Sequence, residues 1–177
     1  AYITPQTPDP VGAFVGNMTM GANGSGACEI GLEASKRALT PSSAGGYSDT
    51  YNTDFYREDA RLAIIIVSDE PDGSTIPSDP WGISDCSYAI TWNEYINWLL
   101  NLKGAHSADE IFFAAIVGPQ GGCSSNWGDA GTGDGYLEVV NNLGPDMALQ
   151  YSICEHDWSD VMVQLGIEAS GLRTAFH

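Results

Sequence analysis

Two stretches of the chain are continuously apolar and stop abruptly at polar residues. Leu62 to Val67 shows neither the alternation of a half-buried strand nor the stripe of a helix, and four of its six residues are β-branched. Glu110 to Gly118, EIFFAAIVG, repeats this pattern. Both predict strands buried on their two faces and parallel to each other, and we expect the strand at 61–68 to lie in the middle of the sheet.

Helical patterns lie between and around these strands. The clearest helix starts with a capping box, Thr91 and Glu94, and should end at Gly104. Its apolar face consists of Trp92, Tyr95, Ile96, Leu99 and Leu102. The remaining expected elements are a helix starting at Pro10 after the cap Asp9, helices near 28–39, 136–143 and 158–169, and a weaker strand near 147–154. This order predicts an α/β, Rossmann-like, three-layer fold, a parallel sheet flanked by helices, in one domain over residues 1–177.

Three acidic residues follow the first apolar strand within the sequence SDEPD. In open α/β sheets the ligand crevice lies beyond the carboxyl ends of the strands, where Asp69, Glu70 and Asp72 would stand. Carboxylates are ligands that Mg²⁺ and Ca²⁺ prefer, so we interpret Asp69 as a metal ligand and the other two as ligand-binding residues. The alternative is a solvated turn, since Asp72 precedes a glycine.

The charge of the chain restricts its partners. Twenty-three acidic and six basic residues give a formal charge of −17, which repels nucleic acid and anionic membranes and attracts divalent cations. No apolar stretch has transmembrane length, so we expect neither membrane insertion nor a signal peptide within residues 1–177.

Four widely spaced cysteines lack CxxC spacing, which favours disulfides over a zinc or thioredoxin-type motif. Three pairings are possible. We favour Cys123 with Cys154, because both follow strands that we expect to be neighbours, which leaves Cys28 with Cys86. This interpretation predicts an extracellular protein, secreted or surface-displayed, whereas four buried thiols would fit a reducing cytosol.

Several segments in order resemble the von Willebrand factor A-type domain, particularly its bacterial secreted forms. They are GSGACEIGLEASKRAL at 24–39, FYREDARLAIIIVSDEPD at 55–72, LKG at 102–104, IVGP at 116–119 and SICEHDW at 152–158. The resemblance implies a metal-ion-dependent adhesion site built from a DxSxS motif, a Thr and an Asp. Asp69 matches the Asp and Ser25 lies near the Thr position, with Thr19 as the alternative.

No DxSxS occurs in the chain. We therefore expect it in an upstream segment, together with further strands, so that residues 1–177 form the C-terminal portion of such a domain. Another polypeptide or that upstream segment should then pair with the strand at 61–68, because open apolar strand edges are avoided.

The residues favour a binding function over catalysis. There is no GxSxG elbow and no motif that joins Ser25 to a histidine. The first hypothesis is a non-enzymatic binding or adhesion module, in which a divalent cation, Mg²⁺ or Ca²⁺, binds an acidic ligand on a protein or cell surface. The alternative is a structural component of a larger extracellular or virion assembly with a degenerate metal site. A metal-assisted hydrolase is the third hypothesis.

Overall fold

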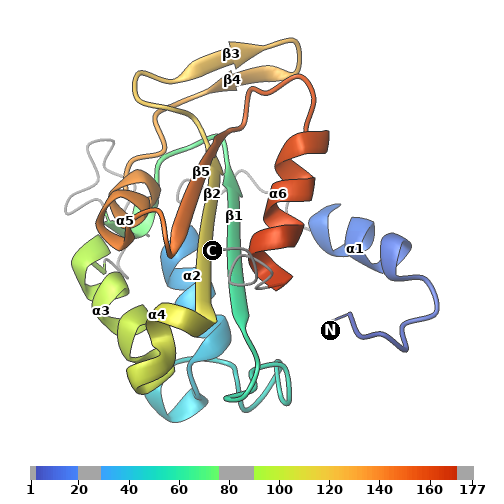
Figure 1. Cartoon of the computed structure of the whole chain (residues 1–177), viewed down its shortest axis with the longest axis vertical. Helices are drawn as coiled ribbons and strands as arrows, with labels where there is room; N and C mark the ends of the chain where they lie inside the picture. Colours follow the sequence, from blue (N-terminus) through green and yellow to red (C-terminus); the bar gives the residue numbers. More distant parts are fainter. Residues whose placement is uncertain (1–2, 20–28, 76–89, 171–177) are drawn as a thin grey trace. The chain divides into compact units, whose positions relative to one another are not determined.

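The computed structural model describes residues 3–19, 29–75 and 90–170 (Figure 1). The chain divides into two compact units. The smaller unit consists of Ala1–Ala27 and Lys36–Arg57, and the larger of Cys28–Ser35 and Glu58–His177. Helix α2 (Gly31–Leu39) begins in the larger unit and ends in the smaller one.

The smaller unit contains helix α1 (Pro10–Thr19) and a 3-10 helix, η1 (Ser42–Ala44). The predicted cap of α1 is confirmed, because an Asp9 carboxylate oxygen accepts a hydrogen bond from the Gly12 N–H at 2.9 Å. A long loop follows η1. The Asp49 carboxylate closes that loop by accepting hydrogen bonds from the Ser42 N–H and hydroxyl, at 2.7 and 2.9 Å, and these bonds lower the pKa of Asp49.

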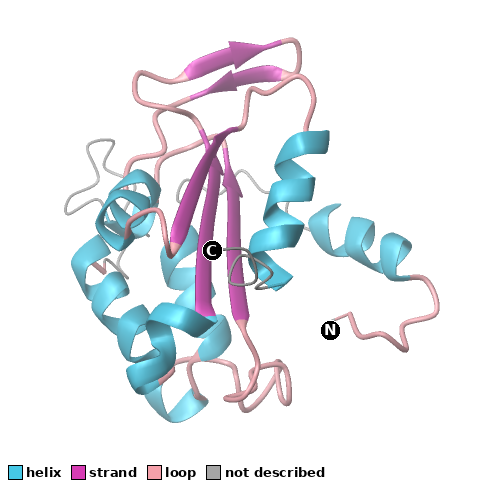
Figure 2. Cartoon of the chain, in the orientation of Figure 1, coloured by secondary structure: helices cyan, strands magenta, loops and turns pink. Residues whose placement is uncertain are grey.

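The larger unit is built on a parallel sheet of three strands in the order β1-β2-β5 (Figure 2). These strands are β1 (Leu62–Ser68), β2 (Ile111–Val117) and β5 (Ala148–Ser152). Helices α3 (Trp92–Leu102) and α5 (Tyr136–Leu143) cover one face, and α6 (Ser159–Ser170) lies on the other. The predicted α/β class, with a parallel sheet between helices, is confirmed and is compatible with a Rossmann-like fold.

Strand β2 is the centre of the core, and all of its residues are buried. On one face, the Phe113 ring meets Tyr95 of α3 edge-on, with centroids 6.1 Å apart. On the other face, Phe112 and Ile116 pack with Leu165 of α6. A side chain of this size contributes about 2 kcal/mol when fully buried, so β2 supplies much of the stability of the unit.

Strand β1 lies at the edge of the sheet, so the prediction that it is central is wrong. Among the described residues, only β2 pairs with it. Ile65 and Val67 stand in register with Ala114 and Ile116, on the α6 side, and are 43% and 45% exposed. Helix α6 packs against β2 and leaves these two side chains partly uncovered. A continuous apolar run shows that a strand can be buried on both faces, but it does not determine whether the strand has one neighbouring strand or two.

The capping box of α3 is confirmed. The Thr91 hydroxyl accepts a hydrogen bond from the Glu94 N–H at 3.2 Å, and the Glu94 carboxylate accepts one from the Thr91 N–H at 2.7 Å. The helix ends where expected, before Gly104, whose positive φ of 59° favours glycine. A 3-10 helix, η3 (Gly104–His106), and the short helix α4 (Ser107–Glu110) then lead into β2.

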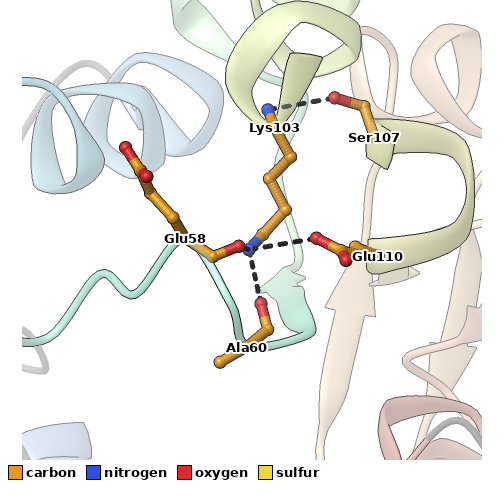
Figure 3. A network of polar contacts seen from close by, with 5 residues as sticks. All are labelled: Glu58, Ala60, Lys103, Ser107 and Glu110. Carbon is orange, nitrogen blue, oxygen red and sulfur yellow. Dashed lines mark hydrogen bonds and ion pairs between the residues drawn. The ribbon is translucent and has the colours of Figure 1, made fainter. Parts of the chain in front are cut away.

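Lys103 joins three segments at the amino-terminal end of the sheet (Figure 3). Its ammonium group donates hydrogen bonds to the carbonyl oxygens of Glu58 and Ala60, at 2.9 and 2.5 Å, and lies 3.6 Å from the Glu110 carboxylate. Its backbone N–H donates to the Ser107 hydroxyl at 3.0 Å. The Lys103 side chain is only 1% exposed. It therefore fixes the segment that enters β1 to the end of α3 and to α4.

Replacing Lys103 with methionine should lower the free energy of unfolding by about 2 kcal/mol, because the apolar stem is kept while two carbonyl groups lose their donor. Urea denaturation followed by circular dichroism measures this loss. Lys36→Met is the matched control, because Lys36 is the other lysine of the sequence and lies in helix α2. This substitution should change the free energy of unfolding by less than about 0.5 kcal/mol. Equal losses for the two variants would contradict the anchoring role.

Candidate binding site at the carboxyl edge of the sheet

A short hairpin stands beyond the carboxyl ends of the strands. It consists of β3 (Cys123–Ser125) and β4 (Gly128–Ala130), which pair antiparallel. The predicted disulfide between Cys123 and Cys154 is present and fastens the hairpin to the segment after β5. Two backbone hydrogen bonds hold the segment that follows β4, from the Gly131 N–H to the Asp69 carbonyl at 2.8 Å and from the Gly133 N–H to the Gly118 carbonyl at 2.9 Å.

Close backbone approach explains one glycine of this region. A Cβ atom on Gly118 would stand 1.8 Å from the Gly131 carbonyl oxygen. Only glycine therefore allows the chain leaving β2 to pass against the segment that follows β4.

The hairpin and the end of β1 enclose an open pocket of about 160 Å³. Its lining residues are Asp69, Ser125, Trp127, Gly128, Asp129, Ala130, Ile153 and Cys154. Asp69 and Asp129 are exposed, and Trp127 is 89% exposed at the tip of the hairpin. The Trp127 N–H donates to the Ser125 hydroxyl at 3.1 Å, which fixes the backbone at the tip.

Asp72 differs from the other two predicted acids, because it is fully buried. Its carboxylate accepts hydrogen bonds from the Leu32 N–H at 3.1 Å and the Ser74 hydroxyl at 2.5 Å. The Ser74 hydroxyl oxygen in turn accepts the Glu33 N–H at 3.4 Å. Asp72 and Ser74, from the 3-10 helix η2 (Gly73–Thr75) and the residue before it, thus cap the start of α2.

This cap decides where α2 begins. The sequence predicted a start near Cys28, whereas the helix starts at Gly31, next to the two captured N–H groups. Burial raises the pKa of Asp72, while hydrogen bonds from Ser74 and the Leu32 N–H oppose the rise. The Tyr136 ring packs against the first residue of α2, since a Cβ atom on Gly31 would lie 2.5 Å from the Tyr136 hydroxyl oxygen. Burial, and then the charge of Asp72, raise the pKa of Tyr136.

Ser68 links the end of β1 to Glu29, two residues before α2. Its hydroxyl lies 2.8 Å from a carboxylate oxygen of Glu29, to which it donates, and 3.2 Å from the Glu70 N–H, from which it accepts. Glu70 itself is exposed. Among the predicted site residues, Asp69 therefore lines the open pocket, Glu70 lies beside it at the surface, and Asp72 belongs to the interior.

Three predicted residues, Ser25, Cys28 and Cys86, lie outside the described part of the chain. Six lining residues of the pocket were not predicted, and three of them carry polar or aromatic side chains, namely Ser125, Trp127 and Asp129. The sequence feature that could have indicated them is the single tryptophan within the Gly- and Ser-rich segment 121–135.

The pocket brings two carboxylates to one surface. Within the described ranges, no group of three or more His, Cys, Asp or Glu side chains is arranged to hold a metal ion. No described helix is both long and apolar enough to cross a membrane.

Comparison of the chain with models of known protein families, with curated proteins and with solved structures gave no match. The fold defines an α/β protein with a parallel sheet, and the open pocket lies at the carboxyl edge where such sheets bind ligands.

Proposed function

We propose that the chain is a non-enzymatic binding or adhesion module of the von Willebrand factor A type, which acts outside the cell as a secreted or surface-displayed protein. The observation that carries the proposal is the position of Asp69, which follows a parallel strand directly and lines an open pocket at the carboxyl edge. The Cys123–Cys154 disulfide supports an oxidising environment.

In this proposal, Asp69 is one ligand of a Mg²⁺ or Ca²⁺ ion. Hard divalent cations take six or more oxygen ligands, so the pocket needs oxygens beyond its own carboxylates and the Ser125 hydroxyl. A DxSxS motif in an upstream segment, the hydroxyl of Ser25 and an acidic oxygen of the bound partner would supply them. The partner is thus a protein or cell surface that presents a carboxylate.

Titration of the protein with Mg²⁺ and Ca²⁺ by isothermal calorimetry tests this account. Asp69→Ala should weaken ion binding at least about tenfold, because a direct carboxylate ligand of a divalent ion is lost. Asp146→Ala removes the same charge before β5, at the opposite end of the sheet, and should have little effect. An unchanged ion affinity for Asp69→Ala would refute the metal site.

A second function is favoured by the open edge of β1. In this alternative, the chain is a structural component of a larger extracellular or virion assembly, and the site holds no metal. The half-exposed Ile65 and Val67 stand on a strand whose outer side has no strand partner among the described residues. Such an edge accepts an added strand from another polypeptide or from an upstream segment.

Hydrogen exchange distinguishes this alternative. In the assembled protein, amides on the outer side of β1 should exchange as slowly as those of β2, and Ile65→Lys with Val67→Lys should abolish this protection. Val163→Lys, at a 63% exposed position of α6, serves as the control. Rapid exchange of the outer β1 amides in every form of the protein would exclude strand addition.

A further inference from the structure

The Trp127 side chain is exposed, but its backbone belongs to a hairpin that is fixed to the sheet. It is 89% exposed, yet the hairpin that carries it is fixed by a disulfide, by its strand pairing and by the Gly131 to Asp69 hydrogen bond. An exposed indole on a fixed backbone loses little conformational freedom when a ligand covers it. This combination is typical of a contact residue in a binding surface.

The pocket beside Trp127 offers acceptors and an aromatic face. Its two ionisable side chains are the carboxylates of Asp69 and Asp129, and its lining residues include no Lys, Arg, His, Asn or Gln. The Ser125 hydroxyl is already engaged, since it donates to the Gly128 carbonyl at 3.3 Å and accepts the Trp127 N–H. Apart from the indole N–H of Trp127, the remaining hydrogen-bonding groups of the lining side chains are therefore the carboxylate oxygens, which accept and do not donate.

We propose that this pocket binds an arginine side chain of a protein partner. A guanidinium group has five N–H donors and no acceptor, which complements a lining of carboxylates. It also stacks on indole faces through a cation–π contact. The formal charge of −17 attracts a basic partner surface toward the site.

Arginine fits this pocket better than the other ligands that tryptophan surfaces bind. A neutral saccharide presents both donors and acceptors, and the side-chain donors that its acceptors would find among the lining residues are the engaged Ser125 hydroxyl and the single indole N–H of Trp127. A lysine ammonium would make the same charge contacts without the planar stacking on Trp127. The inference deepens the proposed binding function, because it names the chemistry of one partner group, but it does not require a metal ion at Asp69.

The test is an NMR titration of the ¹⁵N-labelled protein in EDTA, with acetyl-Gly-Arg-Gly-amide as the probe. The peptide should shift the Trp127 indole N–H resonance and the backbone amide resonances of residues 123–130 in a saturable way, and the backbone amides give the affinity of every variant. The matched peptide with citrulline, a neutral isostere of arginine, should bind at least about threefold more weakly, as expected for loss of a cation–π contact and a charged pair. Trp127→Ala and Asp129→Asn should each weaken the arginine peptide by a similar factor.

Asp146→Asn, which removes one charge far from the pocket, should leave the affinity unchanged. The inference is overturned if citrulline binds as well as arginine, if a neutral oligosaccharide such as cellotetraose binds while the arginine peptide does not, or if Asp146→Asn weakens binding as much as Asp129→Asn. The EDTA condition separates this result from the ion titration, so either proposal can fail while the other holds.

Discussion

Replacing Asp72 with alanine is expected to destabilise the protein by about 3 kcal/mol, the largest effect of any single substitution considered. The change would leave the buried Leu32 N–H and Ser74 hydroxyl without their acceptor and would remove the cap of α2. Urea denaturation monitored by circular dichroism measures the loss. Asp69→Ala is the matched control, since it removes an exposed carboxylate three residues away and should cost less than about 0.5 kcal/mol.

Asp72→Asn should cost less than Asp72→Ala, because an amide oxygen can still accept the Leu32 N–H and its NH₂ can donate to the Ser74 oxygen. A loss for Asp72→Asn as large as that for Asp72→Ala would show that the charge, and not the hydrogen bonds, stabilises the start of α2. No loss in either variant would contradict the capping role.

The difference in stability between the wild type and Asp72→Asn should depend on pH. Burial raises the pKa of Asp72 above its ordinary value of 3.8, so the folded protein keeps this proton at pH values where the unfolded chain releases it. The free energy of unfolding of the wild type, relative to Asp72→Asn, should therefore be highest below pH 3.8 and fall as the pH rises through the raised pKa. A relative stability that increases over this range would contradict the desolvation of Asp72.

Replacing both Cys123 and Cys154 with serine is expected to lower the free energy of unfolding by about 3 kcal/mol. The bond closes a loop with a sequence separation of 31 residues, and its removal gives the unfolded chain more conformations. In the folded state, the substitution should also make the hairpin open more often. Amides of 121–131 should exchange faster with solvent, because the hairpin would be held by hydrogen bonds without a covalent link.

Two measurements decide this second prediction. Chemical denaturation of the double variant gives the change in stability, and hydrogen exchange gives the local opening of the hairpin. Ser124→Ala, at an exposed position between the cysteine and Ser125, is the control for a harmless change in β3. Unchanged stability together with unchanged exchange at 121–131 would mean that the disulfide does not hold the pocket in shape.

The amino-acid sequence was enough to predict the features that depend on near neighbours along the chain. The capping box of Thr91 and Glu94 joins residues three apart, and Asp9 captures the Gly12 N–H over the same distance. The apolar runs at 62–67 and 111–117 specified two strands, and their parallel alignment followed from the helix between them. The Cys123–Cys154 pairing was also predicted, since it rests on the expected adjacency of β2 and β5.

Contacts between distant segments determine which residues at the carboxyl edge are buried and which face solvent, so the sequence did not predict this difference. Asp69 and Asp72 are both acids after the same strand, but Asp72 caps a helix 40 residues away in the sequence, whereas Asp69 lines a pocket with a hairpin about 60 residues further along. The edge position of β1 has the same origin, because strand order is set by packing between distant segments. Local patterns specify elements, while burial and charge at a site depend on the contacts that bring those elements together.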